Sequence, residues 1–111
     1  RLTDMIVTGG ANVYPAEVES AIEELPGVTA AVVVGIPDDE FGSVVAAVVQ
    51  VDHGSGVTEQ HLAEGIAMRL ARYKIPRRWR LITTNLRDDA GKVRRSMWKG
   101  AFAEGDAREA N

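Results

Sequence analysis

Residues 28–51 read V-T-A-A-V-V-V-G-I-P-D-D-E-F-G-S-V-V-A-A-V-V-Q-V and determine the fold. Two almost continuous apolar runs, residues 28–35 and 44–51, flank a polar turn at residues 37–42. Runs this rich in β-branched residues are typical of strands that other elements cover on both faces. The short turn predicts that the two strands pair antiparallel.

The segment before this hairpin predicts a short strand and a helix. Residues 5–7 are apolar and end at Gly9-Gly10, which indicates a strand followed by a turn. Pro15 suits the first turn of a helix, because its missing N–H and fixed φ cost nothing there. The helix ends at Pro26-Gly27, and its apolar stripe has helical spacing: Val18, Ile22 and Leu25.

The segment after the hairpin predicts a second helix, a third main strand and a terminal helix. Thr58 is a suitable N-cap, and the helix stripe that follows comprises Leu62, Ile66, Leu70 and Tyr73. Pro76 prevents this helix from continuing. Residues 79–84 then predict a strand and residues 93–103 a helix, with a frayed tail at residues 105–111. The predicted class is α+β: a small mixed or antiparallel sheet of about three main strands, helices on one face, and a short strand in front.

Length and composition exclude several classes of protein. The chain has 111 residues, of which 45% are hydrophobic, and it contains no Cys. It therefore suits one globular domain and excludes a disulfide scaffold, a thiolate metal site and a thiol nucleophile. No apolar run approaches the ~20 residues that span a bilayer. Because the chain begins with Arg1 rather than Met, we expect a domain of a longer protein.

The charge is distributed unevenly along the chain. Residues 69–99 hold eleven of the thirteen Lys and Arg residues and two of the sixteen Asp and Glu residues. Such asymmetry indicates either an anionic partner or a solvated basic face. The aromatic residues of this segment do not form a regular stacking platform, and the net charge is −3, so nucleic acid is not the expected partner. A small phosphorylated ligand fits better.

Three stretches together resemble the C-terminal domain of the adenylate-forming (AMP-binding) ligases, and the acyl-CoA synthetases most of all. The first, residues 1–19 (R-L-T-D-M-I-V-T-G-G-A-N-V-Y-P-A-E-V-E), is similar to the hinge and glycine motif of that superfamily. The second, residues 34–42 (V-G-I-P-D-D-E-F-G), is similar to its turn between two strands. The third comprises Y-K-I-P-R at residues 73–77 and G-K-V-R-R at residues 91–95. The match covers residues 1 to about 99.

The resemblance implies a two-step reaction. A carboxylate attacks ATP to give an acyl-adenylate and pyrophosphate, and a thiol such as that of CoA then gives a thioester and AMP. The resemblance assigns Lys92 as the catalytic cation of the first step, Arg1 as a nucleotide contact, and Gly9-Gly10 as the loop that approaches the thiol acceptor. It makes residues 1–4 a hinge, with Thr3 and Asp4 in it, about which residues 1–104 rotate as a mobile domain.

The resemblance also implies where CoA binds. Lys74, Arg77 and Arg78 flank Pro76 near the CoA nucleotide, whose phosphates suit Arg forks and a Lys point charge. Phe41 and Tyr73 are candidates to stack on its adenine, although Tyr73 on a helix stripe equally suits packing. No residue of this chain is expected to bind a metal, because Mg²⁺ travels with ATP on a large N-terminal domain that is absent here.

Alternatives and departures stay open at this point. The chain could load a carrier protein instead of CoA, or be a non-catalytic α+β module that binds a nucleotide or a protein. Three features depart from the family pattern: Thr3 at the hinge, Ala11 in the glycine motif, and a shortened loop with Asp88 and Asp89 before Lys92. These two carboxylates could hold the Lys92 ammonium away from substrate. The expected partners are the protein's own N-terminal adenylation domain, CoA and a small carboxylic or fatty acid. The expected location is the cytoplasm.

Overall fold

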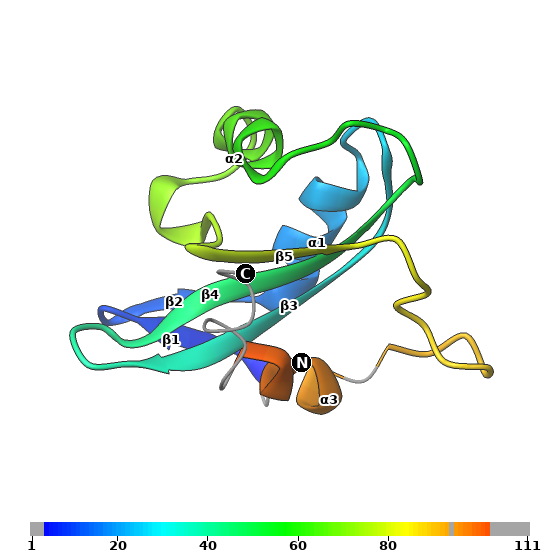
Figure 1. Ribbon diagram of the computed structural model, residues 1–111. Helices are drawn as coiled ribbons and strands as arrows, with labels where there is room; N and C mark the ends of the chain where they lie inside the picture. The colour runs from blue at the N-terminus through cyan, green and yellow to red at the C-terminus, as the bar shows by residue number, and fades with distance from the viewer. Residues whose placement is uncertain (1–3, 94, 103–111) are drawn as a thin grey trace.

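A computed structural model describes residues 4–93 and 95–102, so Arg1, Thr3 and the predicted tail at residues 105–111 lie outside the described residues. Its centre is a three-stranded sheet in the order β3-β4-β5 (Figure 1). The strands are β3 (Val28–Asp38), β4 (Gly42–Val51) and β5 (Arg78–Ile82). β3 and β4 form the predicted antiparallel hairpin, and β5 pairs parallel to β4. The sheet is therefore mixed, as predicted.

A small antiparallel hairpin precedes the main sheet, and the sequence predicted only its first strand. β1 (Ile6–Thr8) pairs with β2 (Ala11–Val13) across Gly9-Gly10. The two glycines have φ values of +57° and +86°. This combination matches the type I′ turn that suits a two-residue hairpin. The strand from Ala11 escaped prediction because three residues are too few for a periodic signal.

The helices lie on both faces of the main sheet, which corrects the prediction that one face carries them. One face packs on α1 (Pro15–Glu23) and α2 (Glu59–Ala67), with Ile22, Leu62 and Ile66 among its most buried side chains. On the other face Phe102, from the 3₁₀ turn Gly100–Phe102 that follows α3 (Arg95–Lys99), packs against alternate residues of β3 and β4. Both faces are covered because both strands are apolar at successive positions, as their runs predicted.

The second helix is shorter than its stripe predicted. The Thr58 hydroxyl caps its N-terminus by accepting from the His61 N–H at 3.1 Å, as expected. It ends at Ala67, however, and Ala71 is extended, so Tyr73 lies instead in a 3₁₀ turn, Arg72–Lys74. A Cβ on Gly65 would lie 2.9 Å from Leu25 Cδ2, so this glycine permits the close approach of α1 and α2. The terminal helix is also shorter than predicted.

The open edge of β3 is protected by carboxylates from α1. The Glu23 carboxylate accepts the Ala31 N–H at 3.0 Å, and the Glu19 carboxylate accepts the Val33 N–H at 2.8 Å. Since unpaired strand amides invite pairing with another chain, these bonds satisfy groups that would otherwise be a liability. They also fix the two side chains beside the sheet.

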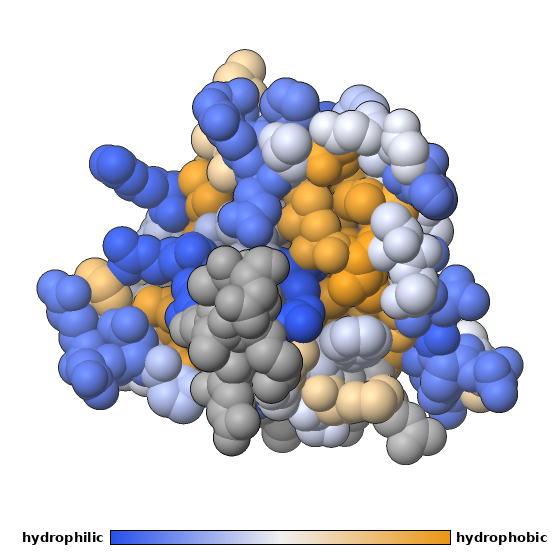
Figure 2. All heavy atoms as spheres, in the orientation of Figure 1, coloured by the Kyte–Doolittle hydropathy of each residue, from blue (hydrophilic) through white to orange (hydrophobic). Residues whose placement is uncertain are grey.

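The visible surface is mainly polar. In Figure 2 hydrophilic side chains surround a hydrophobic area beside the grey residues. In the part of the chain that the structure describes, no helix is long and apolar enough to cross a lipid bilayer.

Candidate functional site

A surface groove of about 750 Å³ collects four of the predicted CoA-binding residues. Three segments far apart in the sequence form it: the β1–β2 hairpin, the β3–β4 turn, and the stretch between α2 and β5. Its lining residues are Thr8, Gly9, Ala11, Phe41, Arg72, Tyr73, Ile75, Pro76 and Arg77. Gly9, Phe41, Tyr73 and Arg77 are thus brought together at one end of the sheet.

Two turns fix the floor of the groove. The Gly9 N–H donates to the Phe41 carbonyl at 2.9 Å, which joins the β1–β2 turn to the β3–β4 turn. Asp38 accepts the N–H groups of Glu40 and Phe41 at 3.0 and 2.9 Å. The acidic run at residues 38–40 therefore shapes a turn. A Cβ on Gly9 would lie 3.3 Å from Phe41 Cδ1, so only glycine leaves this contact relaxed.

Arg77 stacks on Phe41. The guanidinium carbon lies 4.7 Å from the centre of the Phe41 ring. The backbone N–H of Arg77 donates to the Val45 carbonyl at 2.8 Å. The stacked contact holds the guanidinium over the groove and leaves its N–H donors available. Tyr73 is 48% exposed, so the packing role that its predicted stripe position suggested does not apply.

Lys74 is not among the residues that line the groove, although its ammonium lies 5.7 Å from the centre of the Tyr73 ring. Its ammonium donates to both oxygens of Glu17 on α1, at 3.0 and 2.9 Å. These hydrogen bonds raise the pKa of Lys74 above its ordinary value. Lys74 stabilises the domain in this arrangement and does not line the groove. Arg78 is the first residue of β5 and is not among the lining residues of the groove.

Carboxylates of α1 neutralise much of the basic segment, which the sequence did not reveal. The three glutamates of α1 and the C-cap residue Glu24 each pair with a Lys or Arg from residues 69–99. The pairs are Lys74–Glu17, Arg95–Glu19, Arg87–Glu23 and Arg69–Glu24. Three described cations of this segment make no ion pair, hydrogen bond or other charged contact through their side chains: Arg72, Lys92 and Lys99. Arg77 makes only its stacking contact.

The Lys92 loop is folded around Asp88. The Asp88 carboxylate accepts the N–H groups of Ala90 and Lys92, each at 2.9 Å, and the Asp88 N–H donates to the Lys92 carbonyl at 2.9 Å. Gly91 has a φ of +80° in this turn. No carboxylate in the described part of the chain pairs with the Lys92 ammonium, which is exposed. Asp88 thus shapes the loop rather than sequestering Lys92.

Lys92 and the groove lie at opposite ends of the sheet. The groove adjoins the start of β4, whereas the Lys92 loop follows the end of β5, where the Leu86 N–H donates to the Gln50 side chain at 2.9 Å (Figure 1). Gly42 and Gln50 are eight residues apart along β4, which corresponds to roughly 25 Å. Because of this separation, one catalytic centre could contact the two ends only in turn, with a change of domain orientation between the two contacts.

Comparison with known proteins identifies the fold. The family described as "AMP-binding enzyme C-terminal domain" matches residues 17–92. The chain belongs to this family. It is 41% identical over 103 residues to the long-chain-fatty-acid–CoA ligase FadD13 of Mycobacterium tuberculosis, covering 93% of this chain and 20% of that protein.

Two further matches extend this result. The structure of a Mycobacterium tuberculosis fatty acyl CoA synthetase superposes with a TM-score of 0.86 at 40% identity, over 95% of this chain and 21% of that one. The fatty acid–[acyl-carrier-protein] ligase ScoC of Streptomyces coeruleorubidus is 38% identical over all 111 residues, which are 21% of its length. The chain thus spans about a fifth of the length of the relatives it matches.

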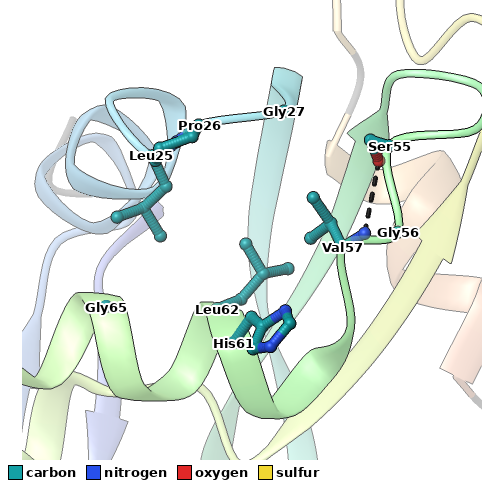
Figure 3. A pocket seen from close by; sticks show the side chains of 9 residues that line it. All are labelled: Leu25, Pro26, Gly27, Ser55, Gly56, Val57, His61, Leu62 and Gly65. Carbon is teal, nitrogen blue, oxygen red and sulfur yellow. Dashed lines mark hydrogen bonds between the residues drawn. The ribbon is translucent and has the colours of Figure 1, made fainter.

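The AMP-binding C-terminal domain has a second cavity that contains none of the predicted site residues. It measures about 370 Å³ and lies between the end of α1, the loop before α2 and α2 itself (Figure 3). Leu25, Val57 and Leu62 point toward it, and its lining includes no Lys, Arg, Asp or Glu. A Cβ on Gly27, whose φ is +82°, would lie 2.6 Å from Val57 Cγ2, so this glycine is required by packing.

Sequence reasoning missed Arg72 as a site residue. It precedes the recognised Y-K-I-P motif and carries no signal of its own in a segment rich in arginine; only the 3₁₀ turn directs it into the groove. Within the described ranges, no three His, Asp or Glu side chains lie close enough together to hold a metal ion.

Proposed function

We propose that this chain is the mobile C-terminal domain of an ATP-dependent, AMP-forming acyl-CoA synthetase. In the first half-reaction a carboxylate oxygen attacks the α-phosphorus of ATP, which forms the acyl-adenylate and releases pyrophosphate. In the second the CoA sulfur attacks the acyl carbon, which forms the thioester and releases AMP. ATP with its Mg²⁺ and the acyl group would be held by the N-terminal domain, and a cytoplasmic location fits these substrates.

The observation that carries the proposal is the placement of the unpaired cations. Four cations of the basic segment pair with carboxylates of the domain, yet Lys92 is exposed at one end of the sheet, and Arg72 and Arg77 line the groove at the other. The adenylation step brings an anionic nucleophile to an anionic phosphate, so a positioned ammonium at Lys92 would stabilise its transition state. The Arg pair suits the phosphates of CoA.

A rotation about the hinge would let the two ends act in turn. Lys92 would face the active site during adenylation, and the Gly9-Gly10 turn with the groove would face it during thioester formation. Arg1 would contact the nucleotide, and Thr3 and Asp4 would carry the rotation, because hinge residues absorb changes in φ and ψ. Lys74 would contribute to CoA binding only if it exchanged Glu17 for a phosphate.

A carrier protein is the second candidate acceptor, because ScoC is named as an acyl-carrier-protein ligase and matches the whole chain. The acceptor is tested with the full-length protein, ATP, a panel of saturated fatty and cinnamic acids, and either CoA or a phosphopantetheinylated carrier protein. We expect AMP and thioester in equal amounts with CoA. If thioester formed with the carrier protein but not with CoA, the carrier protein would be the acceptor. ADP in place of AMP would refute the proposed reaction.

The groove is tested by Arg77→Ala in the full-length protein. We expect the apparent KM for CoA to rise about tenfold, the loss of one charge-assisted phosphate contact, while the KM for ATP stays unchanged. Arg69→Ala, which removes an arginine paired with Glu24 outside the groove, is the control and should leave both values unchanged. An unaltered KM for CoA in Arg77→Ala would remove this residue from the CoA site.

A further inference from the structure

Arg95 connects three parts of the domain that are distant in the sequence. Its Nε and one terminal nitrogen donate to the two Glu19 oxygens at 2.9 and 2.6 Å, and its other terminal nitrogen donates to Asp4 at 3.2 Å. The hydrogen bonds to Glu19 raise the pKa of Arg95 above its ordinary value. The side chain of Glu19 is only 14% exposed. One guanidinium therefore joins α3, α1 and the hinge segment.

The partner that receives Arg95 is itself fixed. Glu19 also accepts the Val33 N–H, so its carboxylate is bonded to the edge of the central sheet as well as to Arg95. Bidentate Arg–carboxylate pairs define both distance and orientation. Arg95 is thus connected through Glu19 to the backbone of β3.

The other end of the Lys92 loop reaches the same helix. Arg87 lies 4.0 Å from Glu23, one helical turn after Glu19. Arg87 is five residues before Lys92 and Arg95 is three residues after it. The loop between them is therefore attached at both ends to one row of carboxylates on α1, with Arg95 making the shorter and less exposed contact.

The short length of α3 makes this attachment important. A helix of five residues has too few hydrogen bonds to be stable by itself, so tertiary contacts determine where it lies. Without the Arg95 fork, the segment that follows Lys92 would lose its link to α1 and to Asp4 together.

We propose that Arg95 is a positioning residue for Lys92: through Glu19 and the hinge residue Asp4 it fixes the Lys92 loop relative to the axis about which the domain rotates. This inference rests on the proposed role of Lys92 in adenylation. Arg95 does not contact substrate in this scheme. It sets where the Lys92 ammonium arrives when the domain is in the adenylation orientation.

The test measures the two half-reactions separately in the full-length protein. Adenylation is followed by ATP–pyrophosphate exchange with the best acid of the panel above, and thioester formation is followed from supplied acyl-adenylate and CoA. We expect Arg95→Ala to lower kcat for adenylation about 10- to 100-fold with little change in KM for ATP, because a misplaced catalytic group costs rate rather than binding. Thioester formation should change less than about threefold by the same reasoning.

Matched variants separate positioning from general destabilisation. Arg69→Ala breaks another Arg–Glu pair at the end of α1 and should change neither half-reaction. Arg95→Lys keeps the charge but loses the fork, so its adenylation rate should fall between those of wild type and Arg95→Ala. If Arg95→Ala does not fold, Glu19→Gln serves instead: its amide oxygen can still accept the Val33 N–H, and the same selective loss is expected.

Equal losses in both half-reactions, or an unchanged adenylation rate in a folded Arg95→Ala or Glu19→Gln protein, would overturn the inference. Lys92→Ala, assayed in parallel, separates this failure from failure of the proposed function. If Lys92→Ala loses adenylation and Arg95→Ala does not, only the positioning role is wrong. If Lys92→Ala itself retains adenylation, the proposed function of the loop is wrong.

Discussion

Lys92→Ala in the full-length protein is expected to slow acyl-adenylate formation about 100- to 1,000-fold, the usual cost of removing one preorganised charge that stabilises a transition state. Thioester formation from supplied acyl-adenylate should be nearly unaffected. The difference arises because the ammonium compensates charge only where carboxylate and phosphate meet. ATP–pyrophosphate exchange and thioester release measure the two steps.

Lys99→Ala is the matched control for this experiment. Lys99 is a second exposed lysine seven residues further along, and no described carboxylate pairs with it. If the positive charge of the segment mattered only in bulk, both variants would lose similar activity. A loss confined to Lys92→Ala requires the specific position, whereas equal losses in the two half-reactions of Lys92→Ala would contradict its assigned role.

Gly10→Leu is expected to have the opposite selectivity. Nothing lies within 4 Å of a Cβ built at Gly10, so a side chain there meets no atom of its own domain. It would project from the β1–β2 turn into the space that we assign to the approaching thiol. We expect thioester formation to fall about 100-fold, as for a misplaced reactant, with adenylation largely retained.

Gly54→Leu controls for backbone strain in that experiment. Gly54 has a φ of +76°, close to the +86° of Gly10, and a Cβ there also meets nothing within 4 Å. Both substitutions should therefore cost about 1–2 kcal/mol of stability, because a side chain disfavours a left-handed conformation. Urea unfolding measures this cost. If Gly54→Leu reduced thioester formation as much as Gly10→Leu, strain rather than obstruction would explain the loss.

The central hairpin and its coverage could be predicted from the sequence because the signal is dense. Residues 28–35 and 44–51 are apolar at successive positions, and such strands are stable only when both faces are covered. The same argument required helices on both faces, so the one-face prediction was inconsistent with it. The terminal helix was predicted over residues 93–103, but α3 ends at Lys99, because so short a helix gives no periodic signal that would mark its end.

Four of the residues that line the groove could be predicted from the sequence, but Arg72 and the charge of the groove could not. The motifs predicted Gly9, Phe41, Tyr73 and Arg77, and the fold places all four in one groove. Lys74 belongs to the same motif, yet it pairs with Glu17, 57 residues earlier in the chain. A count of charges along the sequence cannot reveal such pairs, because the separation of the partners carries no local pattern.

Asp88 shows why a departure from a motif is hard to interpret in sequence. Two acidic residues before Lys92 suggested an ion pair that would restrain the ammonium. The structure uses the Asp88 carboxylate to accept two backbone N–H groups of the same loop instead. Asp residues commonly stabilise turns in this way, and the geometry of the turn decides between the two roles.

The division of the two half-reactions between opposite ends of one sheet is tested most directly by one ratio. In the full-length protein, the rate of adenylation is divided by the rate of thioester formation for wild type, Lys92→Ala and Gly10→Leu. We predict that this ratio falls below the wild-type value in Lys92→Ala and rises above it in Gly10→Leu. A shift of both variants in the same direction, or no shift in either, would contradict the division.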